Sequence, residues 1–132
     1  MTRGSTRAVL SEFVFWLHLV IISAWVALFF VPLSLWPGRI AFHFCFSMVV
    51  IAHQFIWGAI VMPWTKRYRM VCILTTLMQA LRGYKISDPR NFTHSFVQEL
   101  FHRAKVRVPA IVPTALTLGI VTGTTVLYCL SR

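Results

Sequence analysis

The sequence predicts an all-α integral membrane protein with three transmembrane helices and an amphipathic or re-entrant segment between the second and the third. Three observations predict this fold: a mean hydropathy of +0.72, a hydrophobic content of 58%, and three apolar stretches long enough to cross a bilayer. A soluble domain of 132 residues needs a polar surface over a minority core, and this composition leaves too little polar surface. We therefore expect a single membrane domain.

The first predicted span covers about residues 9–35 and is almost uninterrupted apolar sequence, with Glu12 and His18 among its few polar members. As a helix it would be about 40 Å long, whereas the hydrocarbon core is about 30 Å thick. We therefore expect a tilt, or a kink near Pro32. The Trp-Pro-Gly-Arg sequence at residues 36–39 then predicts a tight reversal.

The second predicted span covers about residues 40–62 and the third about residues 108–130. Between them, residues 70–81 are apolar but reach only about 18 Å as a helix, which is too short to span, so we expect an interfacial or re-entrant segment. Residues 91–105 place apolar and polar side chains on opposite sides of a helix and predict an amphipathic helix on the membrane or on a partner. In that segment Glu99 and Arg103 are spaced for an i, i+4 ion pair.

The distribution of basic residues predicts the topology, because short cytoplasmic loops retain Lys and Arg. With three spans, Arg3, Arg7 and the nine basic residues within 66–107 share one side, which leaves two on the other. If the short apolar segment also crossed, the split would become six against seven. We therefore expect the amino terminus on the cytoplasmic side of a bacterial inner membrane or an organellar membrane.

The formal net charge of +10 predicts a lipid partner instead of a nucleic acid. Basic residues that bind nucleic acid form a soluble face, whereas here they flank long apolar stretches, where the counter-charge is an anionic lipid headgroup. The residues expected to contact headgroups are Lys66, Arg67, Arg69, Arg103, Lys105 and Arg107.

The composition argues against most enzyme classes, and no catalytic residue is predicted. Only three acidic residues occur, Glu12, Asp88 and Glu99, so a paired-carboxylate site is not expected. The cysteines are widely spaced, lack a C-x-x-C motif and lie in apolar runs, where we expect buried free thiols. These cysteines are Cys45, Cys72 and Cys129.

Two histidines within predicted spans, His18 and His53, form the candidate cofactor site. Antiparallel neighbouring helices would hold both at a similar depth, roughly 14 Å from one end, where polar groups need a partner. One interpretation is a b-type haem with the two imidazoles as axial ligands. The other is that each imidazole accepts or donates a hydrogen bond that holds helices together. His94 and His102 have no third ligand nearby, so no metal site is predicted.

Small residues at four-residue spacing, Ala115, Gly119 and Gly123, predict a helix-packing surface in the third span. Small side chains let helix backbones approach closely and form contacts that lipid cannot replace. The surface would face either the chain's own helices or another subunit.

A series of short motifs resembles a family of small uncharacterised bacterial multi-pass membrane proteins, known as a domain of unknown function. The motifs are Leu17-His18 in the first span, a Pro-containing reversal, and Gly-x-x-x-x-Pro-x-Thr at residues 58–65, followed by a basic stretch, an amphipathic segment and a final span. The match covers about residues 10–128, and Met62 and Lys66 depart from the family pattern. The resemblance implies an architecture and no activity.

The sequence thus favours a non-enzymatic accessory or assembly subunit of a larger membrane complex, with other membrane protein subunits as partners. The alternative is a b-type haem membrane anchor or electron-transfer protein that uses His18 and His53. A transporter is a weaker interpretation, because three spans leave little room for a pathway.

Overall fold

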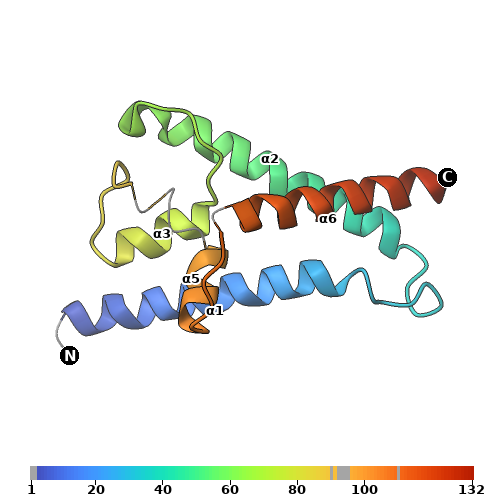
Figure 1. Ribbon diagram of the computed structural model, residues 1–132, viewed down its shortest axis with the longest axis horizontal. Helices are drawn as coiled ribbons and strands as arrows, with labels where there is room; N and C mark the ends of the chain where they lie inside the picture. Colours follow the sequence, from blue (N-terminus) through green and yellow to red (C-terminus); the bar gives the residue numbers. More distant parts are fainter. Residues whose placement is uncertain (1–2, 90, 92–95, 110) are drawn as a thin grey trace.

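The structure, a computed structural model, describes residues 3–89, 91, 96–109 and 111–132 (Figure 1). In these residues the regular secondary structure is helical, and turns and loops join the helices. Its helices are α1 (Arg3–Ala27), α2 (Arg39–Thr65), α3 (Ile73–Leu81), α5 (Phe96–Arg103) and α6 (Ile111–Leu130). By length and composition, three of them can cross a membrane: α1 from Thr6 onward, α2 and α6. The predicted helical fold with three candidate spans is confirmed.

The three long helices alternate in direction along the molecule. Figure 1 shows α1 and α6 running one way and α2 the other, so the two termini lie at opposite ends. Helix α6 packs along α2, where the rings of Phe44 and Tyr128 stack with their centroids 4.3 Å apart. The other large interface joins α1 to the short helix α3.

Helix α1 ends at Ala27, well before the end expected for the first span, and turns follow instead of a kinked helix. Pro32 lacks a backbone N–H and cannot continue the helical ladder. The guanidinium of Arg39 replaces the missing donors: its Nη1 donates to the carbonyl oxygens of Leu28 and Phe29, each at 2.7 Å. The sequence-based boundary differs because this cap comes from the start of the next helix.

Helix α2 continues through Pro63 to Thr65, slightly beyond the predicted end of the second span. It ends where Lys66 adopts a left-handed conformation with φ of 60° and donates its N–H to the carbonyl of Met62 at 2.9 Å. A left-handed residue of this kind is a common helix terminator. The chain can then reverse its direction.

The segment after α2 runs back against the helix that it has just left. Gly58 makes this possible, because a Cβ added there would overlap the carbonyl oxygen of Arg69. Helix α3 then packs against α1 and α2, with the Nε1 of Trp57 donating to Oγ1 of Thr76 at 3.1 Å. The predicted short segment at 70–81 is therefore a helix held between two long ones.

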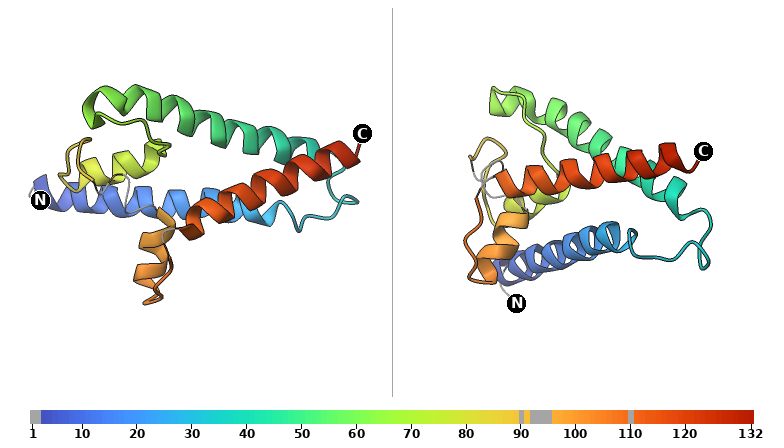
Figure 2. Two further views of the ribbon diagram at one scale, coloured as in Figure 1. Left: turned by 45° about the horizontal axis from the view of Figure 1, so that its top comes forward. Right: turned by 45° about the vertical axis from the view of Figure 1, so that its right-hand side comes forward.

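The buried core lies at this end of the molecule. Val14 and Phe15 of α1, Met78 of α3 and Phe96 of α5 form one buried cluster. Helix α5 crosses α1 (Figure 2), so the predicted amphipathic segment places Phe96 in the core. Residues 92–95 of that segment, His94 included, lie outside the described residues.

We predict that Gly58→Ala destabilises the fold by about 1–3 kcal/mol, because the added methyl meets rigid backbone of the returning segment. Thermal unfolding in detergent, followed by circular dichroism, measures the effect. The matched control is Gly119→Ala in α6, where an added Cβ meets nothing within 4 Å and the unfolding temperature should hold or rise. Equal effects of the two substitutions would contradict the packing described here.

Candidate functional sites

His18 lies at the junction of α1, α3 and α5 and is 7% exposed. Its ring stacks on Phe96, with the centroids 4.2 Å apart, and its Nε2 lies 3.8 Å from the Sγ of Cys72. His53 on α2 is half-buried and close enough to His18 for an electrostatic interaction. The structure thus brings the two predicted histidines towards each other and adds Cys72 and Phe96, which sequence reasoning did not connect with them.

The contact between His18 and Cys72 joins an imidazole to a thiol. Burial raises the pKa of the Cys72 thiol, so the sulfur keeps its proton and can donate weakly to Nε2. A protonated thiol is a poor nucleophile, and the pair acts as a polar contact between α1 and the start of α3. Ligation of a haem iron through Nε2 of His18 would require the ring to turn away from Cys72.

We expect protein purified after expression with haem supplied to show no Soret band, because the Nε2 of His18 is already directed at Cys72. An optical absorption spectrum provides the measurement. The haem alternative would be established instead by a Soret band that disappears in both His18→Ala and His53→Ala. In that case His43→Ala, a matched change near the other end of α2, should keep the band.

Two arginines and two glutamates form an ionic network at the amino-terminal end of α1. Arg82 donates from both Nη atoms to Glu99 at 2.7 Å and from Nε to Ser11 at 2.9 Å. Arg103 donates from both Nη atoms to Glu12 at 2.7 Å, and from Nη2 to Glu99 at 3.0 Å. The network joins α1, α5 and the end of α3, and it contains the expected i, i+4 pair of Glu99 and Arg103.

The network determines the ionisation of Glu99. Burial alone would raise the pKa of this carboxyl, but the hydrogen bonds and the positive charges of Arg82 and Arg103 together outweigh burial and hold the pKa below its ordinary value of 4.5. Arg103 also lies over the ring of Phe15, with its Cζ 3.8 Å from the centroid, so a cation–π contact adds to the ion pairs. Arg103 is one of the residues predicted to contact lipid headgroups. In the structure it instead forms ion pairs with two carboxylates within the chain.

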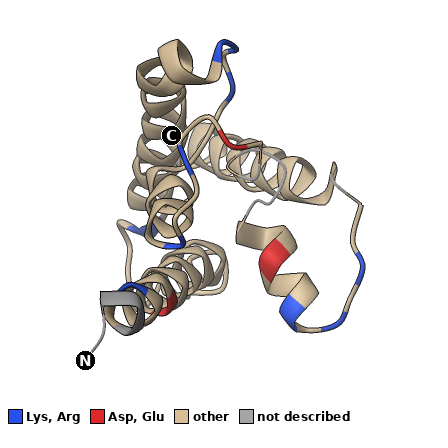
Figure 3. Ribbon diagram, turned by 90° about the vertical axis from the view of Figure 1, so that its left-hand side faces the viewer, with Lys and Arg blue, Asp and Glu red and all other residues tan. Residues whose placement is uncertain are grey.

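The other predicted headgroup residues lie in exposed segments that follow α2 and α5. Figure 3 shows both basic segments in blue, the one after α2 at the top and the one after α5 near the red acidic part of that helix. All five of these residues are exposed: Lys66, Arg67, Arg69, Lys105 and Arg107.

We predict that acid weakens the fold through Glu99. Since the pKa of Glu99 is lower in the folded chain than its ordinary 4.5, its stabilisation is present above that value and is lost as the pH falls through the folded pKa. The unfolding temperature should drop between about pH 5 and pH 3. Glu99→Gln should lower the unfolding temperature at neutral pH and flatten this dependence.

Asp88→Asn provides the matched control, because it removes a carboxylate that takes no part in the ion pairs of Arg82 and Arg103. It should retain the pH dependence of the wild type between about pH 5 and pH 3. A Glu99→Gln chain that loses stability on acidification as steeply as the wild type would contradict the assignment.

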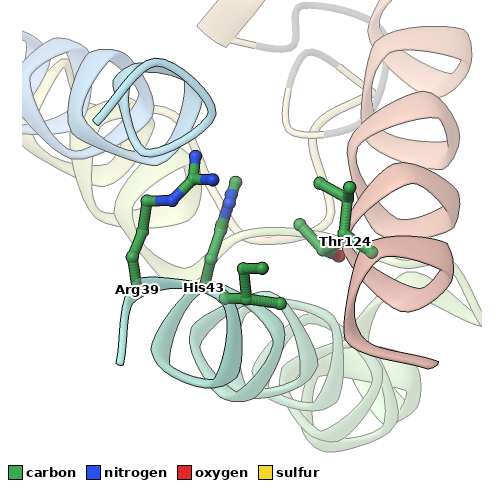
Figure 4. Close-up of a pocket in the computed structure, with 5 residues that line it drawn as sticks. Arg39, His43 and Thr124 are labelled. Atoms are coloured by element: carbon green, nitrogen blue, oxygen red, sulfur yellow. The ribbon is translucent and has the colours of Figure 1, made fainter. Parts of the chain in front are cut away.

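A second polar junction lies at the opposite end of the molecule, where α1, α2 and α6 meet. Trp25 donates from Nε1 to the Oγ of Ser47, which in turn donates to the carbonyl of His43, both at 2.8 Å. Figure 4 shows Arg39 and His43 side by side on α2 with Thr124 opposite them on α6, around a narrow pocket. His43 is 3% exposed, and its ring meets that of Phe29 edge-on at 4.5 Å.

Two buried nitrogens in this junction, Nε of Arg39 and Nε2 of His43, have no hydrogen-bond partner among the described residues. Sequence reasoning placed Arg39 in a turn and gave His43 no role. A signal was present, since Arg39, His43 and Ser47 follow one another at four-residue spacing and form a polar stripe in the first half of a mostly apolar helix. The junction joins the ends of the three candidate spans.

The three small residues at four-residue spacing in α6 have different surroundings. A Cβ added at Gly123 would lie 3.3 Å from the ring of Phe29, so Gly123 allows a close contact within the chain. Ala115 and Gly119 are exposed, and a Cβ at Gly119 would meet nothing within 4 Å. Of the three predicted packing residues, Gly123 therefore lies against the turn that follows α1, whereas Ala115 and Gly119 are exposed.

Among the residues that the structure describes, no three His, Cys, Asp or Glu side chains gather as metal ligands would. Comparison with family models, with curated proteins and with solved structures finds no match to the chain. The resemblance to small bacterial multi-pass membrane proteins therefore stays a prediction.

Proposed function

We propose that this chain is a non-enzymatic accessory subunit of a larger membrane complex and that it binds a transmembrane helix of another subunit through the outward face of α6. One observation carries the proposal. Ala115, Gly119, Thr122 and Val126 are exposed and follow one another at helical spacing, on the side of α6 opposite the buried Thr124. Small and hydroxyl-bearing residues form the centre of this row.

The burial of the three candidate spans supports the same proposal. The share of the apolar membrane-length segment that is buried inside the chain falls from 28% in α1 to 17% in α2 and 6% in α6. Lipid covers large apolar side chains as well as a protein does, but it gains little from a flat surface of Gly, Ala and Thr. A second helix can approach such a surface closely and gain van der Waals contacts, so a protein neighbour suits α6 better than lipid.

The arrangement in the membrane is part of the proposal. Helix α3 packs against the candidate span of α1, and the segment before it lies against α2, so α3 would form a re-entrant hairpin that is shielded from lipid by the long helices. The unequal distribution of basic residues supports a cytoplasmic amino terminus in a bacterial inner membrane or an organellar membrane.

The electrostatics of the polar sites support a structural role. In the ionic network each glutamate carboxylate is occupied by arginine, and the buried thiol of Cys72 remains protonated. Groups engaged in this way hold helices together and are poorly suited to proton transfer or nucleophilic attack.

We predict that Gly119→Leu abolishes binding of the partner subunit and leaves the chain's own fold intact, because the new side chain enters open space within the chain. Extraction from native membranes with a mild detergent, followed by mass analysis of the purified assembly, measures binding. The matched control is Thr114→Leu, which adds bulk to an exposed position to one side of the row and should retain the partner.

Two results of the same experiment would contradict the proposal. A wild-type chain extracted only as a 15.2 kDa monomer would argue against an accessory subunit. Assemblies whose masses are multiples of that value would assign the row on α6 to self-association instead of a different subunit.

A further inference from the structure

A cleft of about 430 Å³ opens at the amino-terminal end of α1, between this helix and the end of α3. Its polar lining includes Arg7, Ser11 and Arg82, and Ala8 and Leu81 provide apolar walls. The cleft thus has a charged region and an apolar region side by side, as an amphiphilic ligand requires.

The cleft carries one unbalanced positive charge. Arg82 and Arg103 are matched by the carboxylates of Glu12 and Glu99, with which they form the ionic network. None of the described ion pairs includes Arg7, so the three arginines exceed the two glutamates by one charge. A single negative charge placed beside Arg7 would make the group neutral.

The cleft also has a hydroxyl donor and an open rim. Ser11 accepts a hydrogen bond from Nε of Arg82 at 2.9 Å, which leaves its own O–H available to donate. At the rim, Gly83 has a φ of 89°, and a Cβ there would meet nothing within 4 Å. The rim is therefore open beside Gly83, and a ligand can enter there.

The position of the cleft indicates the source of the ligand. The candidate span of α1 begins at Thr6, so Arg7 lies at the boundary between the apolar segment and the charged end of the molecule. Lipid phosphates occupy this level of a bilayer. Ala8 and Leu81 provide the apolar lining that the glycerol and the first acyl carbons of such a lipid require.

We propose that this cleft binds the phosphodiester headgroup of one anionic phospholipid. Arg7 binds the phosphate, Ser11 donates its hydroxyl proton to a phosphate oxygen, and Ala8 and Leu81 contact the glycerol and acyl carbons. A phosphodiester carries one negative charge and balances Arg7, whereas the second charge of a phosphate monoester would be repelled by Glu12 in the lining.

We predict that the full-length chain retains phosphatidylglycerol in preference to phosphatidylcholine when mixed micelles are analysed by native mass spectrometry. Arg7→Gln should lower the retention of phosphatidylglycerol roughly fivefold, the usual effect of one basic residue at a membrane surface. The matched control is Lys85→Gln, which removes one positive charge from an exposed residue outside the cleft and should retain the lipid as the wild type does. Ala8→Phe fills the apolar part without changing any charge and should also release the lipid.

The other outcomes would overturn the site. Equal losses in Arg7→Gln and Lys85→Gln would show general attraction to a charged surface. Equal retention of the two lipids, or unchanged retention in Ala8→Phe, would place the lipid elsewhere. Displacement of phosphatidylglycerol from the wild-type chain by inorganic phosphate at millimolar concentration would assign the cleft to a free phosphate ion instead of a lipid.

Discussion

The ion pairs between Arg82, Arg103, Glu12 and Glu99 are the interaction on which the rest of the structure depends. The chain has a net charge of +10 and only three acidic residues, and two of the three are used here. Glu99 accepts from both arginines, so one carboxylate holds α5 to the end of α3 while Glu12 holds α5 to α1. Because the guanidinium groups bind the carboxylates with two hydrogen bonds each, the network fixes orientation as well as distance.

Once α3 and α5 are fixed on α1, the burial of the neighbouring side chains follows. Phe96 enters the core and stacks on His18, and the start of α3 places Cys72 beside the same ring. The segment that leads to α3 must pass close to α2, which only a glycine at position 58 allows. The molecule thus has one tightly packed end, where α1, α3 and α5 meet, and a long helix, α6, whose outward face is exposed.

The helices were predictable from the sequence, and most contacts between them were not. Hydropathy and periodicity report local properties, so they locate three long apolar helices and the amphipathic segment. The end of α1 depends on Arg39, and the Glu12–Arg103 pair joins positions separated by 91 residues, which no local pattern reveals. The i, i+4 pair of Glu99 and Arg103 was predictable because a single helix turn brings its members together.

The two ends of the molecule neutralise partly buried arginine side chains in different ways. At the amino-terminal end of α1, carboxylates balance Arg82 and Arg103. At the other end Arg39 binds the carbonyls of Leu28 and Phe29, where the carboxyl end of α1 has partial negative charge. Neither arrangement uses the exposed residues Lys66, Arg67, Lys105 and Arg107. In the proposed arrangement, anionic lipid headgroups would supply a counter-charge on the side where most of these residues lie, so internal pairing shapes the fold and external pairing would orient the chain.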